Sequence, residues 1–126
     1  MPPKVYELHG TRIFECPEEG SPMGNAQDSV TLIGNARSQN ATLIAIPVAR
    51  LAPDFFRLRT GMAGDMLQKF VMYGVRVAIV GDISQQIAGS TALRDFVIES
   101  NRGNSIWFVA GPAELDSRLA GQSAAR

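Results

Sequence analysis

Short apolar runs alternate with segments of helical periodicity along most of this chain, and that alternation constrains the fold more than any other feature. The runs are Thr42–Ile46, Val75–Val80 and Ser105–Val109. Each has the length and the β-branched or aromatic content of a buried strand. Strands that alternate with helices pair in parallel through right-handed crossovers. The sequence therefore predicts an α/β fold built on a mostly parallel sheet.

Helices are expected between these strands and after the last of them. Apolar spacing and the capping residues Asn25, Thr60 and Ser90 predict helices over Asn25–Arg37, Gly61–Tyr73, Thr91–Arg102 and the segment after Pro112, with a short helical piece over Pro53–Leu58. The last helix should carry an ion pair between Glu114 and Arg118, which are four positions apart. The polar segment 81–90 is expected to be a loop.

Two more strands are expected before the first helix. Lys4–Leu8 and Thr11–Glu15 flank His9 and Gly10, a pair suited to a two-residue hairpin turn. The hairpin adds one antiparallel strand, so the sheet should have five strands and about four helices. A length of 126 residues fits one domain over residues 1–126.

One face of this sheet is a candidate interaction surface. If every crossover advances to the adjacent strand, all helices lie on one face of the sheet. The opposite face would then expose Phe14, Ala45, Ala78, Val80 and Trp107. A bare apolar face is unfavourable in water, which predicts a homodimer or a protein partner on it. The alternative, that some helices cross to this face as in doubly wound folds, stays open.

Charge and composition exclude several classes of function. Twelve Lys and Arg balance twelve Asp and Glu, so no basic excess exists to bind nucleic acid or an anionic membrane. With Cys16 and His9 as the only residues of their types, we expect no internal disulfide, no metal site and no cofactor. No apolar window approaches about 18 residues, and the N-terminus has no apolar signal region. We therefore expect a soluble cytoplasmic protein.

Polar and small residues gather where two of the predicted strands end. Thr60 and Gly61 open the helix that follows the strand at 42–46, and Asp82 and Ser84 follow the strand at 75–80. The carboxyl ends of parallel strands share one edge of the sheet, where ligands of open α/β folds bind. The amides of a helix start and nearby arginines can hold an anion. The predicted ligand-binding residues are Arg57, Arg59, Thr60, Gly61, Asp82, Ser84 and Arg94.

A plainer interpretation of the same residues stays open. Gly61 and Gly64 can ease helix packing, and Asp82 and Ser90 can simply cap loops and helices. The single histidine lies at the hairpin tip, remote from this edge, so a Ser–His–Asp triad is improbable and no catalytic residue is predicted.

Two long stretches carry a resemblance to a known family. They are APDFFRLRTGMAGDMLQKFVMYGVRVAIVGDIS at Ala52–Ser84 and LRDFVIESNRGNSIWFV at Leu93–Val109. Their motifs, DFF-x-L-x-TG-x-AG-x-x-LQKF, AIVGD-x-S and LRDF-x-x-ESNRG, resemble those of a bacterial family known only as a domain of unknown function. The resemblance covers nearly the whole chain after the first hairpin and implies no activity.

The order of elements is also similar to that of the STAS-like fold, found in anti-sigma factor antagonists and sulfate-transporter tails. This resemblance implies a superhelix of four βα turns with an extra N-terminal strand. In the antagonists a phosphorylated serine or threonine lies just before the second helix. The resemblance therefore implies a phosphorylation site at Thr60, which precedes the corresponding helix here.

Two functions follow from these observations. The leading hypothesis is a non-catalytic regulatory or protein-binding module of STAS-like form, because the sequence lacks a catalytic set of residues and predicts a bare sheet face. The alternative is a sensor of small anionic molecules, or a small enzyme, that uses the cleft at the strand ends.

Overall fold

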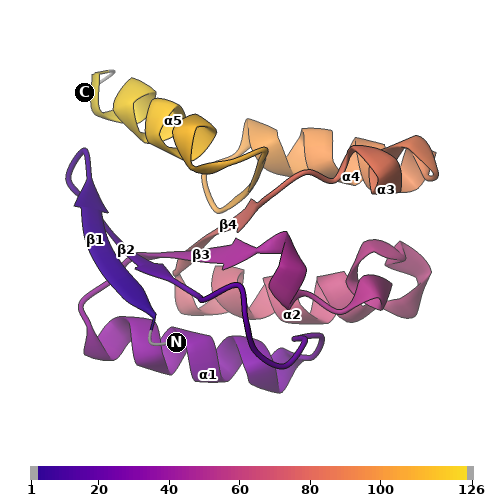
Figure 1. The fold of residues 1–126 in the computed structure, drawn as a ribbon, viewed down its shortest axis with the longest axis horizontal. Helices are drawn as coiled ribbons and strands as arrows, with labels where there is room; N and C mark the ends of the chain where they lie inside the picture. Colours follow the sequence, from indigo (N-terminus) through magenta and orange to yellow (C-terminus); the bar gives the residue numbers. More distant parts are fainter. Residues whose placement is uncertain (1–2, 125–126) are drawn as a thin grey trace.

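The protein folds into a five-stranded sheet with helices on both faces (Figure 1). The computed structural model describes the backbone of residues 3–124 and the side chains of residues 3–122. The strands lie in the order β1-β2-β3-β4-β5, which is also their order along the chain. β1 pairs with β2 antiparallel and the other neighbours pair in parallel, as the sequence predicts. The strands are β1 Lys4–Leu8, β2 Thr11–Glu15, β3 Leu43–Pro47, β4 Arg76–Val80 and β5 Ile106–Val109.

Four of the five helices among the described residues were predicted, and their predicted starts and ends agree with the structure within one or two residues. The helices are α1 Ala26–Ser38, α2 Met62–Tyr73, α3 Ser84–Ala88, α4 Thr91–Arg102 and α5 Pro112–Ala124. The helix α3 was not predicted. The expected loop at 81–90 is wrong in part, because it contains α3. This helix has only five residues, too few to show an apolar period in the sequence. Three 3-10 turns, Val48–Arg50, Pro53–Phe56 and Leu58–Thr60, link β3 to α2.

Local hydrogen bonds explain why the first elements begin where they do. His9 and Gly10 have φ values of 50° and 83°, as a tight hairpin between β1 and β2 requires. The Asn25 side chain accepts the amide of Asp28 at 2.9 Å, and the Asp28 carboxylate accepts the amide of Asn25 at 3.3 Å. This reciprocal capping fixes the start of α1.

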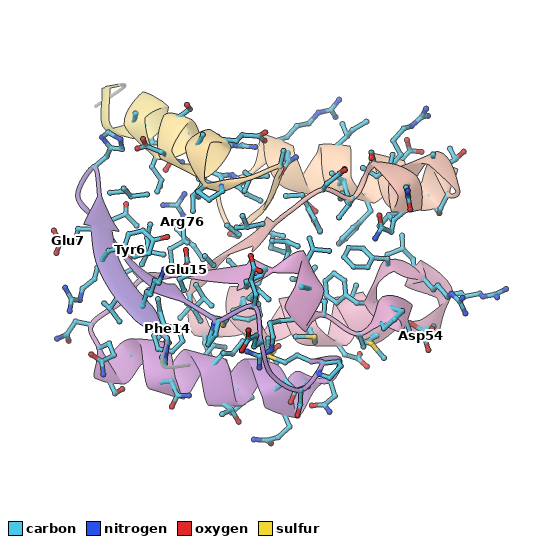
Figure 2. All side chains as sticks on the ribbon, in the orientation of Figure 1. Tyr6, Glu7, Phe14, Glu15, Asp54 and Arg76 are labelled. Carbon is cyan, nitrogen blue, oxygen red and sulfur yellow. The ribbon has the colours of Figure 1, made fainter. Side chains whose placement is uncertain are left out.

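One face of the sheet is covered by α1, α2 and α4. The buried strand residues on that face are Phe14, Ile44, Ile46, Val77, Ile79 and Phe108. Figure 2 shows Phe14 directed toward α1, while Tyr6 and Arg76 lie toward α5. The prediction that Phe14 belongs to a bare face is therefore wrong.

The opposite face is covered by α5, so the prediction of a bare apolar face is also wrong. Leu115 and Leu119 pack on Ile13, Leu43, Ala45, Ala78, Trp107 and Val109. The crossover rule constrains a helix only when another strand of the same sheet follows it. No strand follows α5 within the described residues, so burial of apolar surface decides where it packs. The alternative in which a helix crosses to this face is confirmed.

A stack of three side chains fastens α5 to the sheet. The guanidinium groups of Arg76 and Arg118 both lie over the Trp107 ring, at 4.6 Å and 4.3 Å from the ring centre. Arg118 also donates to the Asn101 carbonyl at 2.6 Å. Glu114 instead accepts the amide of Ala110 at 3.4 Å. The predicted ion pair between Glu114 and Arg118 is therefore wrong, because each side chain has a different partner.

The Asn101 side chain caps the free edge of β5 at Phe108. The Asn101 amide accepts the Phe108 N–H at 2.7 Å and donates to the Phe108 carbonyl at 3.1 Å. Asn101 thus makes the two hydrogen bonds that a further strand would make there.

Candidate functional site

The carboxyl edge of the sheet contains two hollows, one on each face. The first lies between the 3-10 segment after β3 and the short helix α3, and we name it the Arg57 cleft. It has a volume of about 460 Å³. Its lining residues are Val48, Leu51, Pro53, Phe56, Arg57, Gln85, Gln86, Gly89 and Ser90. Of the seven residues predicted to bind a ligand, Arg57 is the one that lines this cleft.

Arg57 is positioned by two buried neighbours. Phe55 and Phe56 fill the core with their rings 5.1 Å apart and nearly perpendicular, which anchors the turn that carries Arg57. The guanidinium lies 3.5 Å from the Asp54 carboxylate, and both side chains are more than half exposed. An exposed pair of this kind contributes little to stability, so Arg57 can turn to another anion at small cost.

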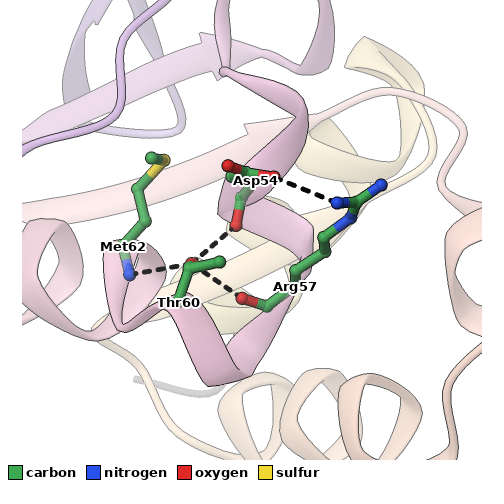
Figure 3. Close-up of polar contacts among 4 residues, drawn as sticks. All are labelled: Asp54, Arg57, Thr60 and Met62. Atoms are coloured by element: carbon green, nitrogen blue, oxygen red, sulfur yellow. Dashed lines mark hydrogen bonds and ion pairs between the residues drawn. The ribbon is translucent and has the colours of Figure 1, made fainter.

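Thr60 and Gly61 join this segment to α2. Figure 3 shows the Thr60 hydroxyl beside the carbonyl oxygens of Asp54 and Arg57, at 2.9 Å and 2.8 Å. The same oxygen accepts the Met62 amide at 3.3 Å. Gly61 has a φ of 77°, which favours glycine, and it is the N-cap of α2 in place of the predicted Thr60. The Thr60 hydroxyl is exposed and already bonded within its own turn.

Asp82 and Ser84 begin α3, which contributes Gln85 and Gln86 to the Arg57 cleft. The Asp82 carboxylate accepts the Ser84 amide at 2.9 Å, and this hydrogen bond lowers the pKa of Asp82. Both side chains are exposed and lie outside the cleft lining.

The two remaining predicted residues, Arg59 and Arg94, are also exposed. Neither lines the Arg57 cleft or the second hollow, which is described below. Arg94, in the first turn of α4, lies 3.7 Å from Asp95. Arg59 lies in the 3-10 turn just before α2. The sequence missed Gln85 and Gln86 because it predicted their segment as loop.

The second hollow lies on the α5 face, and we name it the Glu15 hollow. It has a volume of about 500 Å³. Its lining residues are Lys4, Glu15, Cys16, Pro17, Glu18, Glu19, Ala45, Pro47, Val80, Gly81, Ala110, Gly111 and Pro112. The sequence did not single it out, although the glutamate-rich segment directly after the strand at 11–15 was a signal. The Glu15 hollow forms only because of the position in which α5 packs on the sheet.

A half-buried tyrosine and a buried cysteine adjoin the Glu15 hollow. The Tyr6 hydroxyl donates to the Glu15 carboxylate at 2.8 Å, and burial raises the pKa of Tyr6. Cys16 is 3% exposed, and burial raises the pKa of its thiol to about 11, with Arg50 lowering it and Glu15 raising it to smaller extents. The Cys16 thiol therefore lines the hollow in its neutral form at pH 7.

The Cys16 thiol should react slowly in the folded protein. At pH 8, a rise in thiol pKa from 9.0 to about 11 reduces the thiolate fraction roughly 100-fold. We expect iodoacetamide to label the native protein at least 100-fold more slowly than the protein in urea, and faster with rising pH up to about 11. Mass spectrometry measures both rates. Equal rates would contradict a buried, protonated thiol.

Within residues 3–122, no group of three or more His, Cys, Asp and Glu side chains is arranged to hold a metal ion. Among the described helices, none combines the length and the apolar character needed to cross a bilayer.

Comparison with known proteins identifies a family. Neither a curated protein nor a solved structure matches the chain. A family model described as Domain of unknown function (DUF4180) matches residues 8–119. The match runs from the end of β1 to the last turns of α5, and it agrees with the expected membership in a family without an assigned activity. This chain belongs to the DUF4180 family.

Proposed function

We propose that this protein is a non-catalytic sensor that binds a small anionic molecule in the Arg57 cleft. The observation that carries this proposal is the composition of the cleft lining. It contains one guanidinium, two side-chain amides and a hydroxyl, and no carboxylate. Such a set favours an anion that accepts hydrogen bonds.

The size and surroundings of the cleft support a small organic ligand. Its volume lies within the range of about 300–1,000 Å³ that is usual for small-molecule sites. Val48, Leu51 and Phe56 give it an apolar wall, against which the body of a ligand can pack. The weak pair between Arg57 and Asp54 leaves the guanidinium available to the ligand.

The state of Asp82 supports binding without turnover. A general base works best when its pKa lies near the working pH. The hydrogen bond from the Ser84 amide lowers the pKa of Asp82, which makes this carboxylate a weak base. The alternative of a small enzyme at these strand ends therefore gains no general base from Asp82, whose carboxylate instead starts α3 beside the cleft.

The test is a titration with phenyl phosphate, followed by amide NMR shifts. We expect shifts at Gln86 and Gly89, and an affinity about tenfold weaker in Arg57→Gln, because one charge-assisted hydrogen bond is lost. Arg102→Gln, an exposed arginine at the far end of α4, should bind like the unmodified protein. Phenol serves as the uncharged control ligand. Equal binding of phenol, or unchanged affinity in Arg57→Gln, would overturn the proposal.

A second candidate is a regulatory module of STAS-like form that binds a second copy or a protein partner. One observation favours it: Val71, Met72 and Tyr73 at the end of α2 and Ile98 on α4 are apolar or aromatic and 42–61% exposed. In this proposal the exposed Thr60 hydroxyl at the start of α2 is the phosphorylation site. A partner on the sheet face opposite α1, α2 and α4 is no longer expected, because α5 covers that face. This candidate requires stable association in solution.

A further inference from the structure

The Glu15 hollow exists because α5 does not cover the whole of its face. α5 leaves the carboxyl end of β5 and runs to the amino edge of the sheet, where Asp116 contacts His9 and Gln122 contacts Arg76. The carboxyl ends of β2, β3 and β4 therefore remain open on this face. In Figure 2, Glu15 lies between the strands and α5.

Its location matches the place where open α/β sheets bind ligands. α4, which follows β4, packs on one face of the sheet, while α5, which follows β5, packs on the other. The crevice at the carboxyl ends of two such strands is the usual ligand position. Gly81 and Gly111 border it, and they carry no side chain that would fill the crevice.

The Glu15 hollow is separate from the Arg57 cleft. Gly81 lines the hollow and Val48 lines the cleft. A Cβ placed on Gly81 would lie 2.8 Å from a Val48 methyl carbon, so these two residues are in close contact. The two hollows thus lie on opposite sides of this contact and can bind different molecules.

The floor of the hollow is apolar and built from small side chains. Ala45, Pro47 and Val80 come from adjacent strands β3 and β4, and Pro47 pairs directly with Val80. Small side chains on neighbouring strands leave a flat surface, on which a planar or aliphatic body can pack.

The charged groups around this floor are mainly acidic. Among the lining residues, Glu15, Glu18 and Glu19 contribute three carboxylates, against the one ammonium group of Lys4. The Arg50 guanidinium lies beside this rim, where it donates to the backbone carbonyls of Pro17 and Glu19. Lys4 lies opposite Glu15 in the backbone register of β1 and β2. Tyr6 holds one oxygen of Glu15 at 2.8 Å, which fixes the direction of that carboxylate.

An anionic ligand does not suit the same hollow. The amides at the start of a helix can attract anions, but here the α5 side chain Glu114 already accepts the Ala110 amide, next to Gly111. A carboxylate thus occupies the end of α5 that borders the hollow. We infer that the Glu15 hollow binds a small organic cation, an amine or amidine with a flat apolar body, whose charge is held by Glu15 and its neighbouring carboxylates.

The test compares three ligands of the same shape and different charge. Benzamidine is cationic, benzamide is neutral and benzoate is anionic. We expect benzamidine to shift the amide signals of Gly81 and Gly111, and to bind about tenfold more tightly than benzamide or benzoate. In Glu15→Gln, which retains an acceptor for Tyr6, benzamidine should bind about tenfold more weakly.

Two controls keep the outcome unambiguous. Glu7→Gln removes a carboxylate from the same hairpin but outside the hollow, and benzamidine binding should not change. Raising the salt concentration should weaken benzamidine binding and leave benzamide unaffected. Equal affinities for the three ligands, no shift at Gly81 and Gly111, or unchanged binding in Glu15→Gln would each overturn the inference. None of these results depends on the Arg57 cleft.

Discussion

Replacing Trp107 with alanine should lower the free energy of unfolding by about 3–5 kcal/mol, the usual cost of removing a large buried aromatic ring. The ring is buried, makes cation–π contacts with Arg76 and Arg118, and donates its indole N–H to the Gly103 carbonyl at 2.8 Å. Its loss leaves a cavity under α5 and removes both cation–π contacts. Urea unfolding followed by circular dichroism measures the change, because Trp107 is the chain's single tryptophan and its fluorescence is lost.

Trp107→Phe distinguishes this explanation from a general loss of folding. Phenylalanine keeps an aromatic face for the two arginines and most of the buried area, and it loses the hydrogen bond to Gly103. We expect this variant to remain folded and to be about 1–2 kcal/mol less stable than the unmodified protein. A loss below about 1 kcal/mol in Trp107→Ala would show that the stack does not hold α5 on the sheet.

Replacing Asn101 with alanine should cost about 2–4 kcal/mol, although the side chain is small. Its amide satisfies both the N–H and the carbonyl of Phe108 on the free edge of β5. Leaving buried backbone groups unpaired costs about 1–3 kcal/mol for each group. The unpaired backbone groups of Phe108 should also promote pairing between molecules. Urea unfolding and sedimentation velocity measure the two effects.

Asn104→Ala is the matched control for this prediction. Asn104 is exposed, and its side chain makes one hydrogen bond, to Gln122 at 2.7 Å, among the described residues. We expect a loss of at most about 1 kcal/mol and no new association. The explanation fails if the Asn101 and Asn104 variants lose equal stability.

The sequence predicts most of this fold because the strands and long helices carry local signals. Apolar runs identify β3, β4 and β5, and capping residues such as Asn25 and Ser90 mark helix starts that the structure confirms. The position of α5 has no local signal. Its apolar stripe predicts a helix but not which face of the sheet it covers, since no strand after it restricts its path.

The candidate sites also differ in whether a local sequence signal identifies them or only tertiary packing does. Arg57 is identifiable because a strand end and a helix start place it at the carboxyl edge of the sheet. Glu15 and Gly81 meet in one hollow only because α5 leaves that corner open, which tertiary packing decides. Asn101 illustrates a third case, because the sequence places it in the last turn of the predicted helix Thr91–Arg102, and its bond to the β5 edge requires strand and helix to be placed together.

The sequential order of the strands has a consequence for how the chain folds. Each strand pairs with the strand before it, so the sheet can grow by adding neighbouring βα units, with short loops to close at each step. The contact between His9 and Asp116 is different, because it joins positions 107 apart. The surface on which α5 packs is built from β2, β3, β4 and β5 together, so it is complete only when the sheet has assembled. We therefore expect α5 to dock after the sheet forms, and native-state hydrogen exchange should show α5 opening at a lower free energy than the strands.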